Sequence, residues 1–282
     1  MINYVIYAVT DAGYKFLTDK INNMKKKLSN AGIELSAINI EKDASQLPAP
    51  GEGMLVISDD SKQVKRLLDA GYYVSGFYHE KNKNEMFEGA SYAVSDVEEL
   101  TIRSYDEVYR RLAGIPWDIL ETERLLVRES TVEDVTDFYR IYSEPSITEY
   151  MDDLFENPDE ERAYMKDYIN HMYGFYGFGM WTVIEKAENG IIGRAGLNIR
   201  EGYELPELGF VIEKEYQRKG YAKEICNAIL SYAKEELGFD RVQALVEENN
   251  EPSLRLLTSL GFIYLNEVTE RGVNYQLMTK EI

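Results

Sequence analysis

The chain has 282 residues, 44% of them apolar and 22 of them tyrosine, which is too much large apolar surface for a disordered chain. Its formal net charge of -19 argues against nucleic acid and anionic membranes as partners, because both are negatively charged. No apolar run approaches the ~20 residues that a membrane-spanning helix needs.

The first 113 residues alternate between strand-like and helix-like patterns. Helical spacing predicts helices that end at Gly32 and Gly71, and a closing helix over residues 104–112. Apolar runs predict strands over residues 4–9, 33–40, 54–58, 73–78 and 92–94. Alternation of this kind is typical of an open parallel sheet covered by helices, so we expect an N-terminal α/β domain over residues 1–113.

Part of this domain, from Val56 through Asp59 and Asp60 to Gly71, resembles the later part of haloacid dehalogenase-like phosphatases. That family also needs an Asp-x-Asp pair after its first strand. Here the first strand ends in Thr10-Asp11-Ala12-Gly13, with a single carboxylate. We therefore expect a degenerate, Rossmann-like and non-catalytic domain, and we interpret both aspartates as caps of the next helix. Magnesium-dependent phosphatase activity stays open as an alternative.

Residues 113–122 contain Gly114 and Pro116 and follow neither period, so they are the predicted domain boundary. The second half, residues 121–282, is expected to form a second domain. Thr131 is the expected cap of its first helix, and a second helix follows Pro158. Strands are predicted over residues 124–128, 180–185, 191–199, 207–212, 241–246, 262–266 and 274–279. A long helix is predicted over residues 221–237.

The most informative segment joins the 207–212 strand to this helix, with the sequence Gln217-Arg218-Lys219-Gly220-Tyr221-Ala222. A loop of small and basic residues at the positive end of a helix presents main-chain N–H groups that suit a pyrophosphate. A Cβ atom at Gly220 would hold the anion away from the backbone. The Gly-Lys-Ser/Thr triplet of a Walker loop does not occur here.

The pattern Gln-x-x-Gly-x-Ala in this loop resembles the coenzyme A pyrophosphate loop of the GNAT acetyltransferase superfamily. A second match follows, with Asn250 and Ser253 around the start of a short helix and Leu260-Gly261-Phe262 at its end. The resemblance covers about residues 121–281, and it is closest to the branch that modifies ribosomal-protein N-termini and aminoglycosides. It implies a mixed-sheet α+β GNAT domain with acetyl-CoA as the cofactor.

The resemblance also implies which residues bind coenzyme A. In the family, the pantetheine arm pairs with the fourth strand, and a main-chain N–H of that strand stabilises the oxyanion. The cofactor-binding residues expected here are Phe210, Val211, Ile212, Gln217, Arg218, Lys219, Gly220, Tyr221, Ala222, Asn250 and Ser253.

Acetyl transfer to an amine needs a proton acceptor, because an amine with a pKa of ~10.4 is protonated at neutral pH. Glu207 starts the fourth strand, where some branches of the family place a glutamate, and it is the candidate catalytic base. An exposed glutamate at a strand start explains it equally well. Many relatives carry, at the position of Leu257, a tyrosine that protonates the departing thiolate. The identity of the general acid is therefore open here, with Tyr264 and Tyr275 as possible substitutes.

Most of the negative charge lies in the second half, where residues 121–282 hold 17 basic and 32 acidic residues, a balance of -15. The segment 144–161 is rich in Asp and Glu and has no Lys or Arg. It could steer a cationic amine, although acids near the positive end of a helix have a structural explanation too. We predict an N-acetyltransferase that acts on a primary amine of a small molecule or peptide. A non-catalytic acyl-CoA sensor or adaptor is the alternative.

Two histidines, His79 and His171, and a single cysteine make a protein zinc site improbable. Cys226 lies on the apolar stripe of the predicted long helix, which indicates core packing. One cysteine cannot form an internal disulfide, and the first residues lack the pattern of a signal peptide. We therefore expect a cytoplasmic protein.

Overall fold

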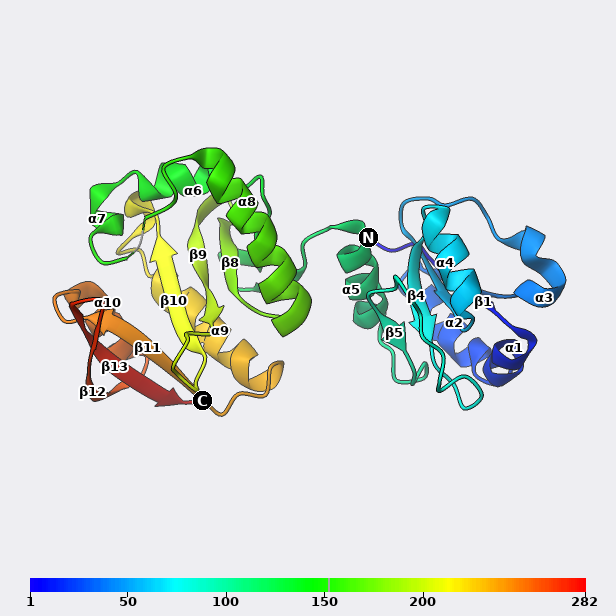
Figure 1. The fold of residues 1–282 in the computed structure, drawn as a ribbon. Helices are drawn as coiled ribbons and strands as arrows, with labels where there is room; N and C mark the ends of the chain where they lie inside the picture. The colour runs from blue at the N-terminus through cyan, green and yellow to red at the C-terminus, as the bar shows by residue number, and fades with distance from the viewer. Residues whose placement is uncertain (152) are drawn as a thin grey trace. The chain divides into compact units, whose positions relative to one another are not determined.

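The computed structural model describes residues 1–151 and 153–282, and the chain divides into two compact units, Met1–Trp117 and Asp118–Ile282 (Figure 1). The division falls inside the predicted boundary segment 113–122. Each unit is built around its own sheet. Among the described residues, no helix combines the length and the apolar character needed to cross a membrane.

The second unit contains an eight-stranded mixed sheet in the order β12-β13-β11-β10-β9-β8-β7-β6. Neighbouring strands are antiparallel except for β10 and β11, which are parallel. The strands are β6 (Asp118–Glu121), β7 (Leu125–Arg128), β8 (Met180–Glu185), β9 (Gly190–Asn198), β10 (Glu207–Ile212), β11 (Arg241–Glu247), β12 (Ile263–Glu270) and β13 (Val273–Glu281). Strand β6 was not predicted, because its four residues lie in the segment assigned to the boundary.

Helices cover both faces of this sheet (Figure 1). They are α6 (Val135–Tyr142), α7 (Pro145–Thr148), α8 (Pro158–Tyr168) with the π-helical continuation η2 (Ile169–Tyr176), the short 3-10 helix η3 (Lys214–Tyr216), α9 (Tyr221–Glu235) and α10 (Glu251–Ser259). Trp181 of β8 contacts Tyr232 of α9 edge-on, whereas Arg194 of β9 lies over Phe138 of α6. Because the register pairs Trp181 with Ala195, the residue after Arg194, these contacts place α9 and α6 on opposite faces.

Thr131 does not cap α6 as the sequence suggested. The helix begins later, at Val135, and the Asp134 carboxylate folds back to accept the Thr131 N–H at 3.0 Å. The same carboxylate forms a bidentate ion pair with Arg128. The helix start is therefore anchored to β7 through Asp134.

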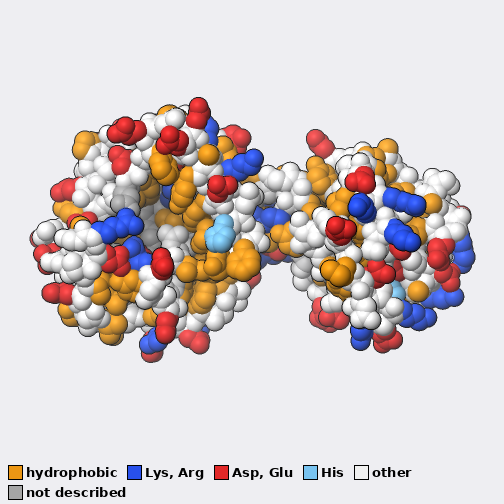
Figure 2. Space-filling view, viewed as in Figure 1, with side chains coloured by type: hydrophobic (Ala, Val, Ile, Leu, Met, Phe, Trp, Pro, Cys, Tyr) orange, Lys and Arg blue, Asp and Glu red, His pale blue; other side chains and the backbone are white. Residues whose placement is uncertain are grey.

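On the face viewed in Figure 2, the second unit is hollowed, and hydrophobic and charged side chains gather around the hollow. The first unit shows no comparable hollow in this view. The hollow is the cleft described below.

The first unit has a five-stranded sheet in the order β2-β1-β3-β4-β5, with every pair parallel, which confirms the predicted parallel sheet. The strands are β1 (Tyr4–Val9), β2 (Glu34–Asn39), β3 (Met54–Ser58), β4 (Tyr73–Phe77) and β5 (Ala93–Val94). The helices are α1 (Asp11–Leu17), α2 (Ile21–Ser29), α3 (Ile40–Asp43), the 3-10 helix η1 (Ala44–Gln46), α4 (Ser61–Asp69) and α5 (Ile102–Ala113). The likeness to haloacid dehalogenase-like domains stays a prediction.

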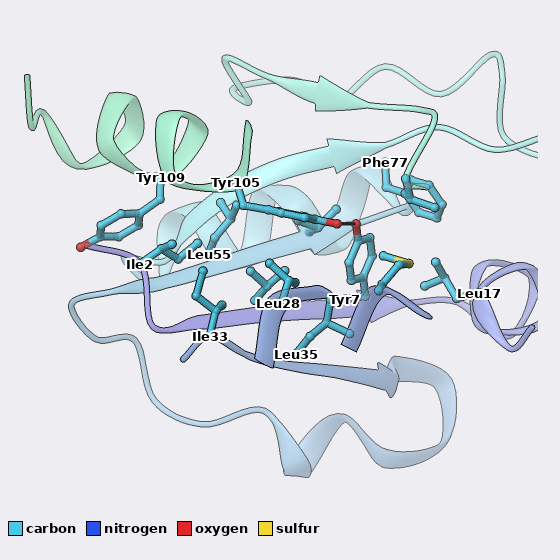
Figure 3. Packing of buried hydrophobic residues seen from close by; sticks show 14 of the residues in the cluster. Ile2, Tyr7, Leu17, Leu28, Ile33, Leu35, Leu55, Phe77, Tyr105 and Tyr109 are labelled. Atoms are coloured by element: carbon cyan, nitrogen blue, oxygen red, sulfur yellow. Dashed lines mark hydrogen bonds between the residues drawn. The ribbon is translucent and has the colours of Figure 1, made fainter. Parts of the chain in front are cut away.

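Buried apolar side chains fill the space between this sheet and its helices (Figure 3). Two tyrosines bring hydroxyl groups into the core, and they satisfy each other: Tyr7 of β1 and Tyr105 of α5 lie 2.8 Å apart. Burial raises the pKa of both phenols, that of Tyr105 to about 12. The hydroxyl of Tyr109 accepts the Gly53 N–H in the same way. Each buried polar group named here therefore has a partner, as a stable core requires.

The two aspartates after β3 have different roles. Asp60 is the N-cap of α4 and accepts the Gln63 N–H at 2.7 Å, as expected. Asp59 is not a cap. Its carboxylate is 1% exposed and accepts both the main-chain N–H and the hydroxyl of Thr10, at 2.7 and 2.6 Å, and it contacts His79 Nε2 at 2.9 Å. It ties the ends of β1, β3 and β4 together at the carboxyl edge of the sheet.

Replacing Asp59 by alanine would leave the Thr10 N–H and hydroxyl without an acceptor inside the protein. We expect Asp59→Ala to lower the unfolding free energy of this unit by about 3 kcal/mol. Asp60→Ala is the matched control, with an expected loss of about 1 kcal/mol for a helix cap. Amide hydrogen exchange in β1 and β3 of the full chain measures both. Equal losses for the two variants would contradict this distinction.

Candidate active site

A cleft of about 2230 Å³ opens in the second unit, between α6–α8, the strands β9–β11 and the first turns of α9 and α10. Ten of the twelve predicted site residues line it: Glu207, Phe210, Val211, Ile212, Gln217, Arg218, Gly220, Ala222, Asn250 and Ser253. Lys219 and Tyr221 are not part of the lining. The fold thus gathers segments that the sequence separates by more than forty residues.

The cleft exists because β10 and β11 separate. β10 pairs with β9 along all six residues from Glu207 to Ile212, but it pairs with β11 only at Glu207 and Gln243. Beyond that point no described residue of β11 continues the ladder. The edge of β10 that faces β11 is therefore left with unpaired main-chain groups. Such an edge can pair with an extended ligand as it would with another strand.

The loop before α9 presents a second set of free main-chain donors. No described residue accepts a hydrogen bond from the N–H groups of residues 218–222. Positive φ angles at Arg218 (58°) and Gly220 (87°) shape the loop, and Gly220 at the N-cap position offers no side-chain cap. Consecutive free N–H groups at a helix N-terminus form an anion site. Gly220 is needed for its backbone angle, since an added Cβ would meet nothing closer than Arg124 at 3.5 Å.

Arg124, just before β7, holds this loop in place through three contacts. Its guanidinium donates to the Lys219 carbonyl at 3.0 Å and to the Glu224 carboxylate at 2.7 Å. It also stacks over the Tyr221 ring, 4.1 Å from the centroid. Lys219 and Tyr221 therefore maintain the shape of the loop instead of lining the cleft. This role of Arg124 was not predicted, because its hydrogen-bond partners lie about 95 residues or more further along the chain.

Glu207 is not an exposed glutamate at a strand start, since the residue is 8% exposed. Both of its carboxylate oxygens accept from Arg200, in a bidentate ion pair. Arg200 also donates to Glu270 at 2.9 Å, and Tyr203 donates to the same carboxylate at 2.7 Å. The hydrogen bonds from Arg200 to Glu207 raise the pKa of Arg200. Two carboxylates thus share one cation at this end of the cleft.

Arg194 lies elsewhere in the cleft and has no such partner. The residue is 9% exposed, its guanidinium lies over Phe138, and its Nε has no hydrogen-bond acceptor. No carboxylate in the described part of the chain forms an ion pair with it. Burial alone would lower the pKa of Arg194, but the hydroxyls of Tyr142, Tyr173 and Tyr168 outweigh burial, and its pKa is raised. Arg194 was not predicted as a site residue, because it lies within an apolar strand that the sequence pattern assigns to the core.

The remaining candidates have ordinary surroundings. Leu257 is fully buried, and Tyr264 is exposed and outside the cleft lining, whereas Tyr275 lines the cleft. Burial raises the pKa of Cys226, which keeps its thiol protonated. Asn250 caps α10 by accepting the Ser253 N–H at 3.2 Å. Within the described residues, no group of three or more His, Cys, Asp or Glu side chains could hold a metal ion.

Part of the acidic segment 144–161 faces the cleft. Glu149, Asp153 and Glu161 belong to the lining, and Glu161 is buried and accepts the Phe155 N–H at 3.1 Å. Asp152, another acid of this segment, lies outside the described residues. Other acids of the segment, such as Asp159 in the first turn of α8, lie near the positive end of that helix and stabilise it.

Comparisons with known proteins agree with this geometry. A family model described as an acetyltransferase (GNAT) domain matches residues 124–263. An uncharacterised N-acetyltransferase, p20 of Bacillus licheniformis, is 30% identical over 146 residues, which is 51% of this chain and 82% of the relative. The uncharacterised N-acetyltransferase YoaA of Bacillus subtilis is also 30% identical, over 147 residues and the same shares.

Solved structures share the fold. A protein from Bordetella pertussis assigned to the GNAT family superposes with a TM-score of 0.52 at 22% identity, covering 58% of this chain and 99% of that one. The ribosomal-protein-S5-alanine acetyltransferase of Vibrio fischeri gives a TM-score of 0.50 at 18% identity, covering 57% and 95%. At these identities the likeness is one of fold alone.

The contacts of Arg124 yield a testable expectation. Replacing Arg124 by methionine removes the bond to the Lys219 carbonyl and the bridge to Glu224, so the loop loses its fixed shape. We expect coenzyme A to bind about tenfold more weakly, since about 1.4 kcal/mol of preorganisation is lost. Calorimetric titration measures this. Arg162→Met, which removes an exposed arginine paired with Asp159, is the control and should bind as the wild type does. Unchanged affinity in Arg124→Met would contradict the supporting role.

Proposed function

The chain belongs to the GNAT acetyltransferase family, and we propose that it transfers an acetyl group from acetyl-CoA directly to a primary amine of a small molecule or peptide. One observation carries this proposal: the strand edge exposed where β10 leaves β11 runs into the loop of free N–H groups at the start of α9. A long ligand with an amide-bearing arm and a diphosphate matches both features at once. Coenzyme A is such a ligand.

The residues present fit coenzyme A, and acetyl-CoA would supply the acetyl group as a thioester. The N–H groups of residues 218–222 would bind the diphosphate, and the main chain of Phe210, Val211 and Ile212 would pair with the pantetheine arm. A main-chain N–H of the same strand would donate to the oxyanion that develops on the carbonyl. Asn250 and Ser253 also line the cleft.

The amine must lose a proton before or during attack, because only its neutral form is a nucleophile. Its nitrogen forms the new bond to the acetyl carbon, the carbon–sulfur bond breaks, and the thiolate leaves. Glu207 is the proposed acceptor of the proton, directly or through water. Arg200 holds the carboxylate in place, and each oxygen keeps a lone pair that an approaching ammonium can reach. The acids of the cleft favour an amine that is cationic in solution.

The proposed role of the first unit is non-catalytic. A phosphatase would use carboxylates at the edge of this sheet to hold magnesium. The Asp59 carboxylate is buried, and both its oxygens are used by Thr10 and His79. Asp60 is used as a helix cap. These contacts favour a structural role for the aspartates over a metal site.

The diphosphate site is tested at Gly220. Gly220→Val forces a branched side chain into a left-handed conformation and crowds the free N–H groups, so we expect coenzyme A affinity to fall at least about tenfold. Gly238→Val is the matched control, because Gly238 also has a positive φ (71°) but lies outside the cleft lining. Calorimetric titration of both folded variants gives the comparison. Equal affinities in the two variants would refute the assignment of this loop.

The catalytic base is tested separately. We expect Glu207→Gln to lower kcat/KM by about 10²- to 10⁴-fold and to leave the affinity for acetyl-CoA unchanged. Glu270→Gln removes the other carboxylate bound to Arg200 and should have a much smaller effect. Release of free thiol from acetyl-CoA, with a panel of amines, is the measurement. Full activity of Glu207→Gln would remove Glu207 from the mechanism, and binding of acetyl-CoA without thiol release on any amine would favour the sensor alternative.

A further inference from the structure

The guanidinium of Arg194, which forms no ion pair with a carboxylate of the described residues, is the feature of the cleft that acetyl transfer, as described above, does not use. A buried charge without a partner is costly, and proteins normally pair such a group or expose it. Here the neighbours are the Phe138 ring and three phenols. The guanidinium is hydrogen-bonded to the Tyr142 side chain, but its Nε atom has no acceptor and no carboxylate of the described residues balances its charge. A buried cation without a carboxylate partner indicates a binding site for a negatively charged group of a ligand.

The register of the sheet puts Arg194 beside the reacting centre. Arg194 of β9 pairs with Val211 of β10, so their Cα atoms are about 5 Å apart and their side chains share the α6 face of the sheet. Val211 lies between Phe210 and Ile212, on the strand whose free edge would hold the pantetheine arm. Any group bound by Arg194 is therefore within a few atoms of the amine that attacks there.

Arg194 and Glu207 lie on the same face of the sheet, and both line the cleft. On the same face, the pair between Arg194–Val211 and Asn198–Glu207 is Gly196 with Gly209, which has no side chains. A Cβ on Gly209 would lie 3.0 Å from the Met180 sulfur, and one on Gly196 would run into the Gly179 main chain. Gly179 and Met180 therefore pack against these glycines, and the cleft that runs past them has a cation at one end and the candidate base at the other.

We propose that Arg194 is a specificity-determining residue that binds a carboxylate of the acceptor, so that the preferred acceptors are free amino acids. This inference rests on the proposed acetyltransferase function and names its substrate class. A carboxylate is favoured over a carbonyl because it neutralises the buried guanidinium, and it can accept two parallel hydrogen bonds from it. The ammonium of the amino acid then faces Glu207 and the acids of the cleft.

Matched pairs of acceptors test this assignment. Each pair is an amino acid and the amine that remains when its carboxylate is removed, such as phenylalanine and phenethylamine, or lysine and 1,5-diaminopentane. For the wild-type chain we expect kcat/KM to favour the amino acid in at least one pair by about 10- to 100-fold, as expected for a hydrogen bond to a charged group. Amino-acid amides and short peptides are added to separate a carboxylate from a carbonyl.

Arg194→Gln should reduce this preference to about one, by raising KM for the amino acid while kcat/KM for the plain amine is retained. Arg194→Lys should keep part of the preference. If both members of a pair lose activity equally in Arg194→Gln, or if the wild type takes amines, amides or peptides as well as amino acids, the proposal is wrong. Thiol release with plain amines would in that case still support acetyl transfer, so the two failures are distinguishable.

Two readouts do not depend on turnover. In the presence of coenzyme A, calorimetry should show that the preferred amino acid binds the wild type about tenfold or more tightly than it binds Arg194→Gln. Arg194→Met, which keeps the side-chain length without the charge, should melt no lower than the wild type, because removing an unpaired buried charge relieves its desolvation. A lower melting temperature together with equal binding would show that Arg194 has a structural role, and would overturn the proposal.

Discussion

The separation of β10 from β11 is the constraint on which the active site depends. In a regular sheet every main-chain group of a central strand is paired, and no ligand can reach it. Here every residue of β10 is paired with β9, but only one residue of β10 is paired with β11. The strand is thereby rigid and yet exposes one edge in the middle of an eight-stranded sheet. The cleft is a consequence of this arrangement, and the free N–H groups at the start of α9 follow the open strand along the chain.

Charge is distributed in the cleft in a way that suits three different ligand groups. Free main-chain donors at the start of α9, supported by Arg124, suit a diphosphate. The ion-pair network of Arg200, Glu207 and Glu270 keeps carboxylates at the opposite end, where a protonated amine would arrive. Arg194 adds a buried cation between them. The strongly acidic surface of this half does not conflict with binding an anion, because the anion site consists of main-chain dipoles and local cations.

How much of this could be predicted from the sequence depends on how local each signal is. The loop from Gln217 to Ala222 and the cap at Asn250 are local patterns, and the structure brings both to the cleft. The parallel sheet of the first unit also follows from local alternation. The surroundings of Glu207 were out of reach, because Arg200 binds Glu207 across the link after β9 and also binds Glu270, which is distant in sequence. Asp59 was assigned as a cap for the same reason, since its partners Thr10 and His79 are distant in sequence.

The central claim is that free amides of one strand edge and one loop hold coenzyme A, and amide hydrogen exchange measures those amides directly. On adding coenzyme A to the full chain, we expect exchange to slow at the β11-facing amides of residues 208–212 and at residues 218–222. Amides of β1 and β3 in the first unit should not change. Protection that spares both segments while coenzyme A binds would contradict the account, because the cofactor would then be held somewhere else.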